Sequence, residues 1–346
     1  MIGIFYALFL ILLGIYSYSQ IDLNLTLLQS SWFLKFQGLM IQLGYFNRPL
    51  SMSIFVILVS LLFITYLFFL QQATLLSKRT LLTVFFALIV VGLFSYPGFS
   101  HDIFNYIFDA RIFVTHQANP YTTTALMFPD DTWTRFMRWT HRSYPYGPIF
   151  LPLTFVFYIL GLGKFLATLL AFKLLMLSAF TGSCLLIYKI AGKKSLFYFA
   201  LNPLIIIEVL ISGHMDVVML FLALLGFWVL TKKNVFLANL DLFLSIGIKY
   251  ATLAFLPVFL FFKSIPEKYK GVLFISMAYV GALAQCFSRE ILPHYFIIPL
   301  AATSLFPGLR RWWIVGVVLS ATLLFSRYSP YLYTGEWPPL KLFFHP

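Results

Sequence analysis

Acidic side chains are rare in this sequence, and several of them lie beside apolar runs. Only 11 of the 346 residues are Asp or Glu. Asp102 follows the apolar run 80–96, and Asp102, Tyr106 and Asp109 have the i, i+4, i+7 spacing of one helical face. A carboxylate at a boundary between lipid and water can have its pKa raised by desolvation, which suits a general base. The alternative is that Asp102 caps a helix N-terminus, a position that favours Asp.

A second group of polar residues lies in and just after the apolar run 196–211. Glu208 lies inside this run, where an ionisable side chain is costly and is therefore a functional candidate. Gly213 permits a tight turn, after which His214 and Asp216 would project together. These two side chains could bind a metal ion, but two or three ligands from one stretch are weak support for a metal site. Hydrogen bonds to substrate hydroxyls are an equal alternative, so we assign no metal and no cofactor and leave a divalent ion open.

Basic residues in the second half of the chain could hold an anion. Lys249 is the only lysine in the apolar run 235–262 and should pair with an anion there. A lipid phosphate would serve, because Lys acts on phosphate as a compact point charge; snorkelling to an interface is the alternative. Arg289 could contact the same phosphate, although an ordinary pair with Glu290 at the end of a span is equally consistent. His294 is a further candidate for substrate binding.

The segment 97–147 is the longest stretch without an apolar run, and a loop of about 50 residues in a compact protein is usually functional. Pro and Gly fix turns at residues 118–121 and 144–148. The aromatic side chains of the segment could line a sugar site or form an interfacial belt. Its candidates for substrate binding are His101, Tyr106, Asp109, Arg111, Asn119, Tyr121 and Tyr146.

The composition indicates that the segments that position these residues are embedded in a lipid bilayer. The chain is 61% hydrophobic and 10% charged, whereas soluble domains are roughly 25% charged. Apolar runs recur at residues 2–19, 50–70, 80–96, 148–163, 165–188, 196–211, 217–231, 235–262, 271–287, 291–306 and 312–326. Because a membrane-spanning helix needs about 20 apolar residues, we predict an all-α polytopic transmembrane bundle of about 10 to 12 spans. It should form one domain over residues 1–346.

Short basic clusters predict the orientation of the bundle. The clusters at 78–79, 193–194, 232–233, 263–270 and 310–311 should face the cytoplasm. A helical loop at 97–147, after the third span, would then be extracytoplasmic, and every acid except Asp241 and Glu267 would lie on its side. The crossings between Gly147 and Lys193 must be odd in number, yet two apolar runs lie there. Either the first run is re-entrant or interfacial, or Lys193 lies on the outer side.

Three classes of site are not supported. The formal net charge of +13 does not indicate nucleic-acid binding, because the basic residues form short clusters between apolar runs. Cys184 and Cys286, the only cysteines, fall in apolar segments and support neither a disulfide framework nor a thiolate metal site. The sequence has no Gly-rich phosphate loop and no Asp-x-Asp pair, so a nucleotide site is not predicted.

Several short motifs follow one another between residues 95 and 257. They are His101-Asp102-x-x-x-Tyr106 with Asp109-Ala110-Arg111, then Asn119-Pro120-Tyr121, Tyr146-Gly147-Pro148, Asn202-Pro203-Leu204, Ser212-Gly213-His214-Met215-Asp216 and Ile248-Lys249-Tyr250. In this order they resemble the GT-C superfamily of polytopic glycosyltransferases, in particular the bacterial polyprenyl-phosphate-mannose-dependent mannosyltransferases. The family pattern Gly-His-Asn-Asp has Met215 in place of the Asn, so the role of that Asn is not carried over.

The resemblance implies an inverting glycosyltransferase in which Asp102, matching the family's essential Asp, is the catalytic base. A sugar, expected to be mannose, would pass from a polyprenyl-phosphate donor to a lipid-linked or cell-envelope glycan acceptor. The active site would lie on the extracytoplasmic face of a bacterial plasma membrane. Lys249, with Arg289 or Arg111, would steady the departing phosphate.

Two other functions compete with this interpretation. A transporter or flippase of lipid-linked sugars would also need many spans, but transporters usually contain internal repeats and ionisable groups near the bilayer midplane. No repeat is visible here, and most acids are predicted on one face. A structural subunit would have no use for the intramembrane Glu208 and Lys249. The sequence therefore favours an enzyme.

Overall fold

The computed structural model describes residues 2–23, 25–73, 76–287 and 290–338. These residues form helices and no strand, which confirms the all-α prediction. The first half contains α1 (Ile2–Tyr16), α2 (Ser31–Ile41), α3 (Arg48–Gln71), α4 (Lys78–Phe94), α5 (Asp102–Val114), α6 (Phe150–Leu160) and α7 (Phe165–Ala200). The second half contains α8 (Pro203–Ile205), α9 (Asp216–Thr231), α10 (Val235–Ile246), α11 (Leu256–Leu260), α12 (Glu267–Phe287), α13 (Ile297–Ser304) and α14 (Arg310–Thr334).

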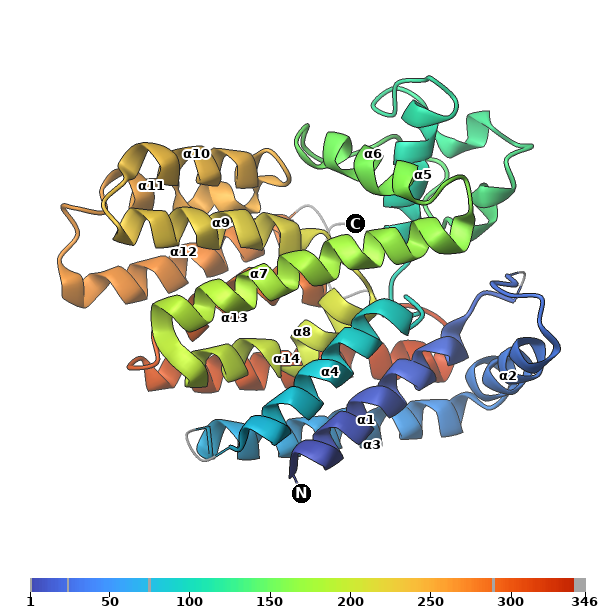
Figure 1. The fold of residues 1–346 in the computed structure, drawn as a ribbon, viewed down its shortest axis with the longest axis horizontal. Coiled ribbons are helices and arrows are strands. Elements are labelled where there is room, and N and C mark those ends of the chain that lie inside the picture. The colour runs from blue at the N-terminus through green and yellow to red at the C-terminus, as the bar shows by residue number, and fades with distance from the viewer. Residues whose placement is uncertain (1, 24, 74–75, 288–289, 339–346) are drawn as a thin grey trace.

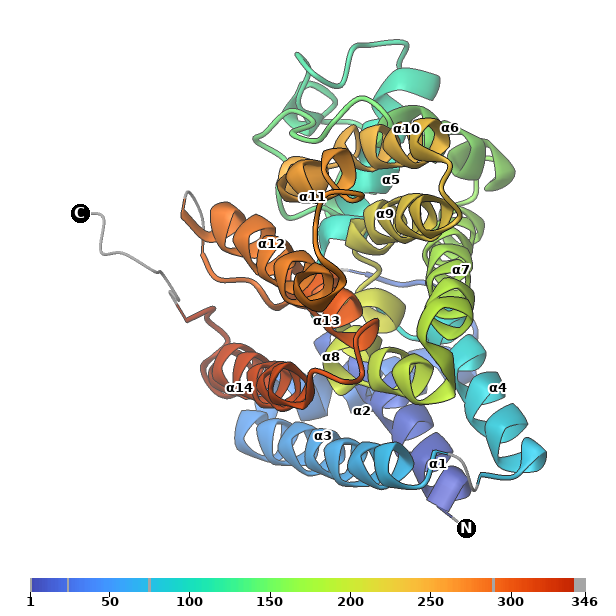
Figure 2. The same ribbon diagram turned by 90° about the vertical axis from the view of Figure 1, so that its left-hand side faces the viewer.

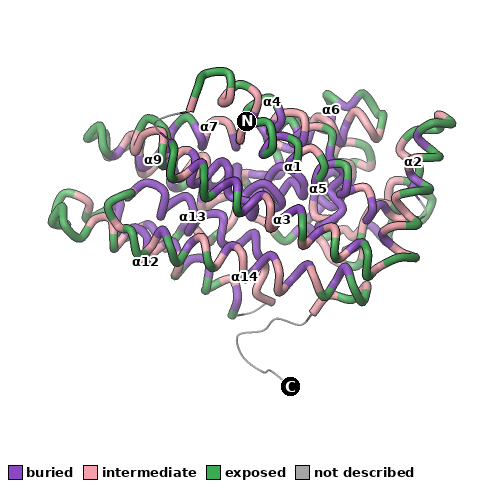
Figure 3. The backbone as a smooth tube through the Cα atoms, turned by 90° about the horizontal axis from the view of Figure 1, so that it is seen from below, coloured by how far each residue is buried: buried purple, intermediate pink, exposed green. Residues whose placement is uncertain are grey.

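The helices form two groups with a shared layer between them (Figures 1 and 2). Helices α9, α10 and α11 lie on one side, α1, α3 and α4 lie on the other, and α7, α8 and α13 run between them. Burial follows this arrangement, because α13 is buried throughout while the outer faces of α12 and α14 are exposed (Figure 3). Large apolar side chains on the outer faces, such as Ile57, Phe86 and Val318, are more than half exposed. Such faces suit contact with lipid.

Five helical segments of the described chain are long and apolar enough to cross a membrane, as expected for a polytopic protein. They are Ile2–Gln20, α3, α7, α12 and α14. A bent pair formed by Pro203–Ile211 and α9 makes a sixth candidate, and α4, with 17 residues, is at the lower end of the usual range. Uninterrupted spans are thus fewer than the apolar runs of the sequence. The run 235–262, for instance, is divided into α10, a 3-10 helix at Tyr250–Phe255 and α11.

Helix α6 explains how the chain returns from the long loop. It has 11 residues and is therefore about 16 Å long, too short for a hydrocarbon core of about 30 Å. It packs against α5, which belongs to the segment 97–147, and against α7. Between Gly147 and Lys193, α7 is the helix long enough to cross a membrane. This length favours the alternative in which the first apolar run after Gly147 is re-entrant or interfacial. At the far end of α7 the chain reverses at Gly192, whose φ of 83° requires a glycine.

The bent pair brings two polar segments into the centre of the bundle. Residues Ile206–Ile211 form a short π-helix, a feature frequent at functional sites. The segment Pro203–Ile211, which ends with this π-helix, and α9 meet at 113° across residues 212–215. Gly213 at the bend has a φ of +73°, as the tight turn predicted from the sequence requires.

Lys173 of α7 holds the end of the π-helix, a role that the sequence did not indicate. Its buried ammonium group donates to the carbonyl oxygens of Leu210 and Ile211 at 3.0 and 3.2 Å, and to Ser95 Oγ at 2.9 Å. Cations are favourable at the negative end of a helix. Lys173 therefore fixes the bend between the π-helix and α9.

Replacing Lys173 by Met is expected to lower the free energy of unfolding by about 2 kcal/mol, because buried carbonyl groups lose their donor. The measurement is the thermal melting temperature in detergent. Lys189→Met, which removes an exposed lysine of the same helix, is the control. Equal melting temperatures for the two variants would contradict this role of Lys173.

Candidate active site

A polar cavity of about 440 Å³ lies where α5, the bent pair, the break after α10 and the start of α13 meet. It brings together eight of the residues proposed from the sequence: His101, Asp102, Tyr106, Tyr146, His214, Asp216, Lys249 and His294. These residues come from segments almost 200 positions apart. The tertiary structure thus assembles most of the predicted set in one place.

Asp102 is presented by the N-terminus of α5. The residue before the helix is His101, and Asp102 occupies the first helical turn. The alternative of Asp102 as the N-cap is therefore wrong, although an acid in the first turn is still favoured by the helix dipole. The Asp102 side chain is 17% exposed and reaches the cavity. It is thus accessible to a substrate hydroxyl.

A chain of polar contacts runs from Asp102 into the protein interior. His214 Nε2 lies 3.6 Å from Asp102 Oδ2, and His214 Nδ1 lies 3.1 Å from Glu208 Oε2 and 2.9 Å from the Glu208 carbonyl oxygen. The Tyr328 hydroxyl of α14 donates to Glu208 Oε1 at 2.6 Å. Glu208 is fully buried behind His214 and does not line the cavity. Its position makes it a support for His214 rather than a direct substrate contact.

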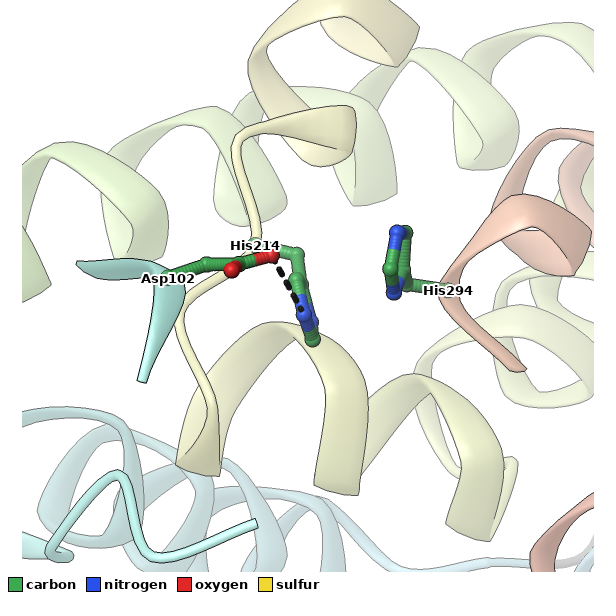
Figure 4. Close-up of side chains that lie close together, drawn as sticks. All are labelled: Asp102, His214 and His294. Atoms are coloured by element: carbon green, nitrogen blue, oxygen red, sulfur yellow. Dashed lines mark ion pairs between the residues drawn. The ribbon is translucent and has the colours of Figure 1, made fainter. Parts of the chain in front are cut away.

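His294 completes this group from the opposite side. It lies in the 3-10 helix Pro293–Phe296, and its ring stacks on that of His214 with centroids 4.1 Å apart and an interplanar angle of 22°. Figure 4 shows Asp102 on one side of His214 and His294 on the other. One ligand atom from each of the three residues lies within 4.8 Å of the others. These are the described residues that could hold a metal ion.

Lys249 contributes a positive charge to the lining of the cavity. It lies in extended conformation at the break between α10 and the following 3-10 helix, and its ammonium group pairs with Asp216 Oδ1 at 3.0 Å. The ammonium group also lies 4.7 Å from the centre of the Tyr295 ring. Asp216 begins α9 and is buried. The anionic partner predicted for Lys249 is thus Asp216 in this structure.

The cavity also contains residues outside the set of substrate-binding candidates, and one of them, Trp139, belongs to the loop aromatics that could line a sugar site. Arg138, Trp139 and Arg142 reach the cavity from the long loop, and Arg327 of α14 pairs with Glu290 at 2.7 Å. The loop arginines had no signal beyond their place in segment 97–147. No local pattern pointed to Tyr328, because its partner Glu208 is 120 positions away.

Other candidates lie outside the cavity. Arg111 pairs with Asp131 at 2.5 Å and donates to the Tyr158 hydroxyl at 2.9 Å, while the Asn119 side chain accepts from the Tyr121 backbone N–H. Tyr121 itself is 42% exposed on the loop. Asp109 is buried in α5 without lining the cavity, and Arg289 lies outside the described residues.

Asp109 has a different role from Asp102, which precedes it by two helical turns. Burial raises the pKa of Asp109 to about 8, an effect that the charge of Arg142 opposes. The unfolded value is near 3.8, so the folded protein holds the extra proton between about pH 4 and pH 8. The free energy of unfolding therefore falls as pH rises through this window.

Asp109→Asn is expected to remove this dependence. Relative to the variant, the wild type should lose stability on the order of a few kcal/mol between pH 5 and pH 8. The measurement is the melting temperature of both proteins across this range, with Asp130→Asn, an exposed acid of the same loop, as control. Taking the difference between proteins removes the opposite contribution of His101, whose pKa burial lowers to about 4. Parallel curves for wild type and Asp109→Asn would contradict the prediction.

A second, mainly apolar groove of about 600 Å³ adjoins the polar cavity. It runs between the segment 250–257 and α12, where it is lined by residues such as Leu253, Pro257, Met277 and Val280. Tyr146, Lys249 and Tyr295 line both spaces. Lys249 therefore stands at the junction of a polar cavity and an apolar groove.

Comparisons with known proteins identify the family. No curated protein and no solved structure gives a significant match to this chain. Residues 5–263, three quarters of the chain, match the N-terminal domain of a family described as alpha-(1->6)-mannopyranosyltransferase. The residues that form the bend, Asp102 and Lys249 all fall within this match. The chain belongs to this family of membrane mannosyltransferases.

Proposed function

We propose that the protein is an inverting mannosyltransferase that uses a polyprenyl-phosphate-linked mannose as donor and a lipid-linked or cell-envelope glycan as acceptor. The observation that carries the proposal is the shared cavity. Asp102 and Lys249 line it together, and an apolar groove meets it at Lys249. A base, a cation for a leaving phosphate and a path for a lipid chain are thus adjacent.

Asp102 acts on the acceptor. Its carboxylate takes the proton of the acceptor hydroxyl while that oxygen attacks the anomeric carbon of the donor. The bond between the anomeric carbon and the phosphate oxygen breaks in the same step, and its electron pair leaves with the polyprenyl phosphate. A single displacement of this kind inverts the anomeric configuration. The family description supports an α-(1→6) linkage in the product.

Lys249 acts on the donor. Its ammonium group stabilises the charge that develops on the departing phosphate oxygen. Phosphate binding requires Lys249 to share its charge between the phosphate and Asp216. The polyprenyl chain follows the groove along residues 250–257 and α12, whose apolar lining matches an isoprenoid. A nucleotide-linked donor would leave this groove without a ligand.

The active site faces the extracytoplasmic side of a bacterial plasma membrane. The ends of α7, α9, α11 and α14 that carry the basic clusters lie together at the left of Figure 1, and α5 and α6 lie at the right. Basic clusters favour the cytoplasmic side. The cavity, which α5 borders, therefore opens on the opposite face.

The direct test uses purified protein in liposomes with radiolabelled polyprenyl-phosphate mannose and total membrane glycolipid. We expect label in the glycolipid fraction, and an α-(1→6)-specific mannosidase should release it. Movement of labelled donor across the bilayer without transfer to acceptor would overturn the proposal and support a flippase. Transfer from a nucleotide sugar in place of the lipid donor would reject the donor class.

A further inference from the structure

Among the described residues, the carboxylates around His214 have no Lys or Arg partner, unlike the other acids of the cavity. Asp216 pairs with Lys249 and Glu290 pairs with Arg327. In the described residues, Asp102 and Glu208 form ion-pair contacts with His214 alone. Even a protonated His214 would leave one of these two negative charges unmatched, and Glu208 is fully buried. Unpaired charge at such a site is costly.

The hydrogen bonding of His214 leaves its Nε2 atom facing a carboxylate oxygen of Asp102. Nδ1 has the Glu208 carbonyl oxygen at 2.9 Å and a Glu208 carboxylate oxygen at 3.1 Å, so Nδ1 carries a proton. In the neutral ring Nε2 then presents a lone pair to Asp102 Oδ2, which also accepts. The two atoms are 3.6 Å apart, too far for a direct hydrogen bond.

This separation fits a metal ion between the two atoms. Zinc lies about 2.0–2.2 Å from imidazole nitrogen and carboxylate oxygen, so two of its tetrahedral ligands are about 3.4 Å apart. His294 offers a third ligand atom within 4.8 Å of the other two. Because its ring is stacked on that of His214, His294 must turn about its side-chain bonds to aim at the ion. To reach the spacing of about 3.4 Å, the ligand atom of His294 must move toward the other two by up to about 1.4 Å.

The surroundings of His214 also match those of a metal ligand. Metal-binding histidines usually donate their other ring N–H to a carboxylate or a backbone carbonyl, which fixes the tautomer. The Glu208 backbone carbonyl accepts from His214 Nδ1, the Glu208 carboxylate lies 3.1 Å from the same nitrogen, and Tyr328 donates to that carboxylate. The three ligands border an open cavity, as expected where a metal keeps one position for a substrate.

We propose that Asp102, His214 and His294 form a binding site for a divalent transition-metal ion of the zinc type. Two carboxylates, Asp102 and Glu208, are neutralised by its two positive charges. The role of the ion in catalysis rests on the proposed function. With the acceptor hydroxyl as fourth ligand, the ion makes this hydroxyl more acidic, and its proton passes to the Asp102 oxygen that does not bind the ion.

The test measures ion binding without any substrate. Protein purified in detergent through a tag without histidine is stripped with a chelator and dialysed against Zn²⁺ or Co²⁺. Zinc content by mass spectrometry, the visible absorption of bound Co²⁺ and the melting temperature with and without Zn²⁺ are compared. The variants are His294→Gln and His214→Gln, and His141→Gln, which removes an exposed imidazole of the long loop, is the control.

We expect one ion per chain and a zinc-dependent rise in melting temperature for wild type and His141→Gln. Both ligand variants should bind at least about 10-fold more weakly, while a melting transition in chelator shows that they are folded. Absence of stoichiometric binding in the wild type, or unchanged binding in His294→Gln, would overturn the site. A protein that binds one ion but transfers mannose equally well after chelation would overturn the catalytic role of the ion and leave the proposed function intact. Stoichiometric ion binding without any mannosyl transfer would support the metal site and overturn the proposed function.

Discussion

Asp102→Asn is expected to lower the rate of mannosyl transfer by roughly 10³-fold, the usual contribution of a positioned general base. The amide has nearly the shape of the carboxylate but cannot take the acceptor proton. Asp102 is partly exposed in the first turn of α5, so the fold should tolerate the change. The measurement is single-turnover transfer from labelled polyprenyl-phosphate mannose, together with the melting temperature.

Two further variants test whether the loss of transfer depends on a carboxylate at position 102. Asp130→Asn removes an exposed carboxylate of the same loop and should leave the rate unchanged. Asp102→Glu keeps a carboxylate at a shifted position and should retain more activity than Asp102→Asn. If Asp102→Asn transfers mannose at the wild-type rate, Asp102 is not the base.

Lys249→Gln is expected to have the second large effect, because it acts on both stability and transfer. Asp216 would be left buried without its cation, and breaking a buried pair by removing one partner costs about 3–5 kcal/mol. The leaving phosphate would lose its stabilising charge, which should lower kcat/KM roughly 10²-fold or more. The measurements are the melting temperature and the rate of transfer at several donor concentrations.

The double variant Lys249→Gln/Asp216→Asn distinguishes these two effects. It removes the unpaired carboxylate, so the melting temperature should return toward the wild-type value. Transfer should stay low, because no cation replaces Lys249 at the junction of cavity and groove. Lys263→Gln, an exposed lysine at the opposite end of the bundle, is the matched control. Recovery of transfer in the double variant would mean that Lys249 serves only to neutralise Asp216.

The two predictions test different substrates of one cavity. Asp102 is presented by the loop helix α5 and is proposed to act on the acceptor. Lys249 is presented at a helix break beside the apolar groove and is proposed to act on the donor. Loss of acceptor transfer with intact donor binding is thus expected for Asp102→Asn alone. Photo-crosslinking of a polyprenyl-phosphate analogue would measure donor binding in both variants.

Local sequence patterns were sufficient to predict an all-α membrane protein and several of the residues that meet at the cavity. Apolar runs must form helices in lipid, since every backbone polar group there needs an internal partner. The i, i+4 spacing of Asp102 and Tyr106 brought both to the cavity, and Gly213 formed the turn that places His214 and Asp216. These are short-range constraints, and each is encoded within a few residues. The family match supports the same interpretation independently.

Only the tertiary structure decided which polar residues meet. Asp109 shares the helical spacing of Asp102, yet helix packing buries it away from the cavity. Tyr328 supports Glu208 from 120 positions away, and Lys173 holds the end of a helix that lies 37 positions further along. Such contacts depend on how helices are packed against one another, and no pattern within a single helix contains that information. The predicted residues that line the cavity therefore lie in short local motifs, whereas the packing of α5, α7, α9 and α14 around the bend determines how they are assembled.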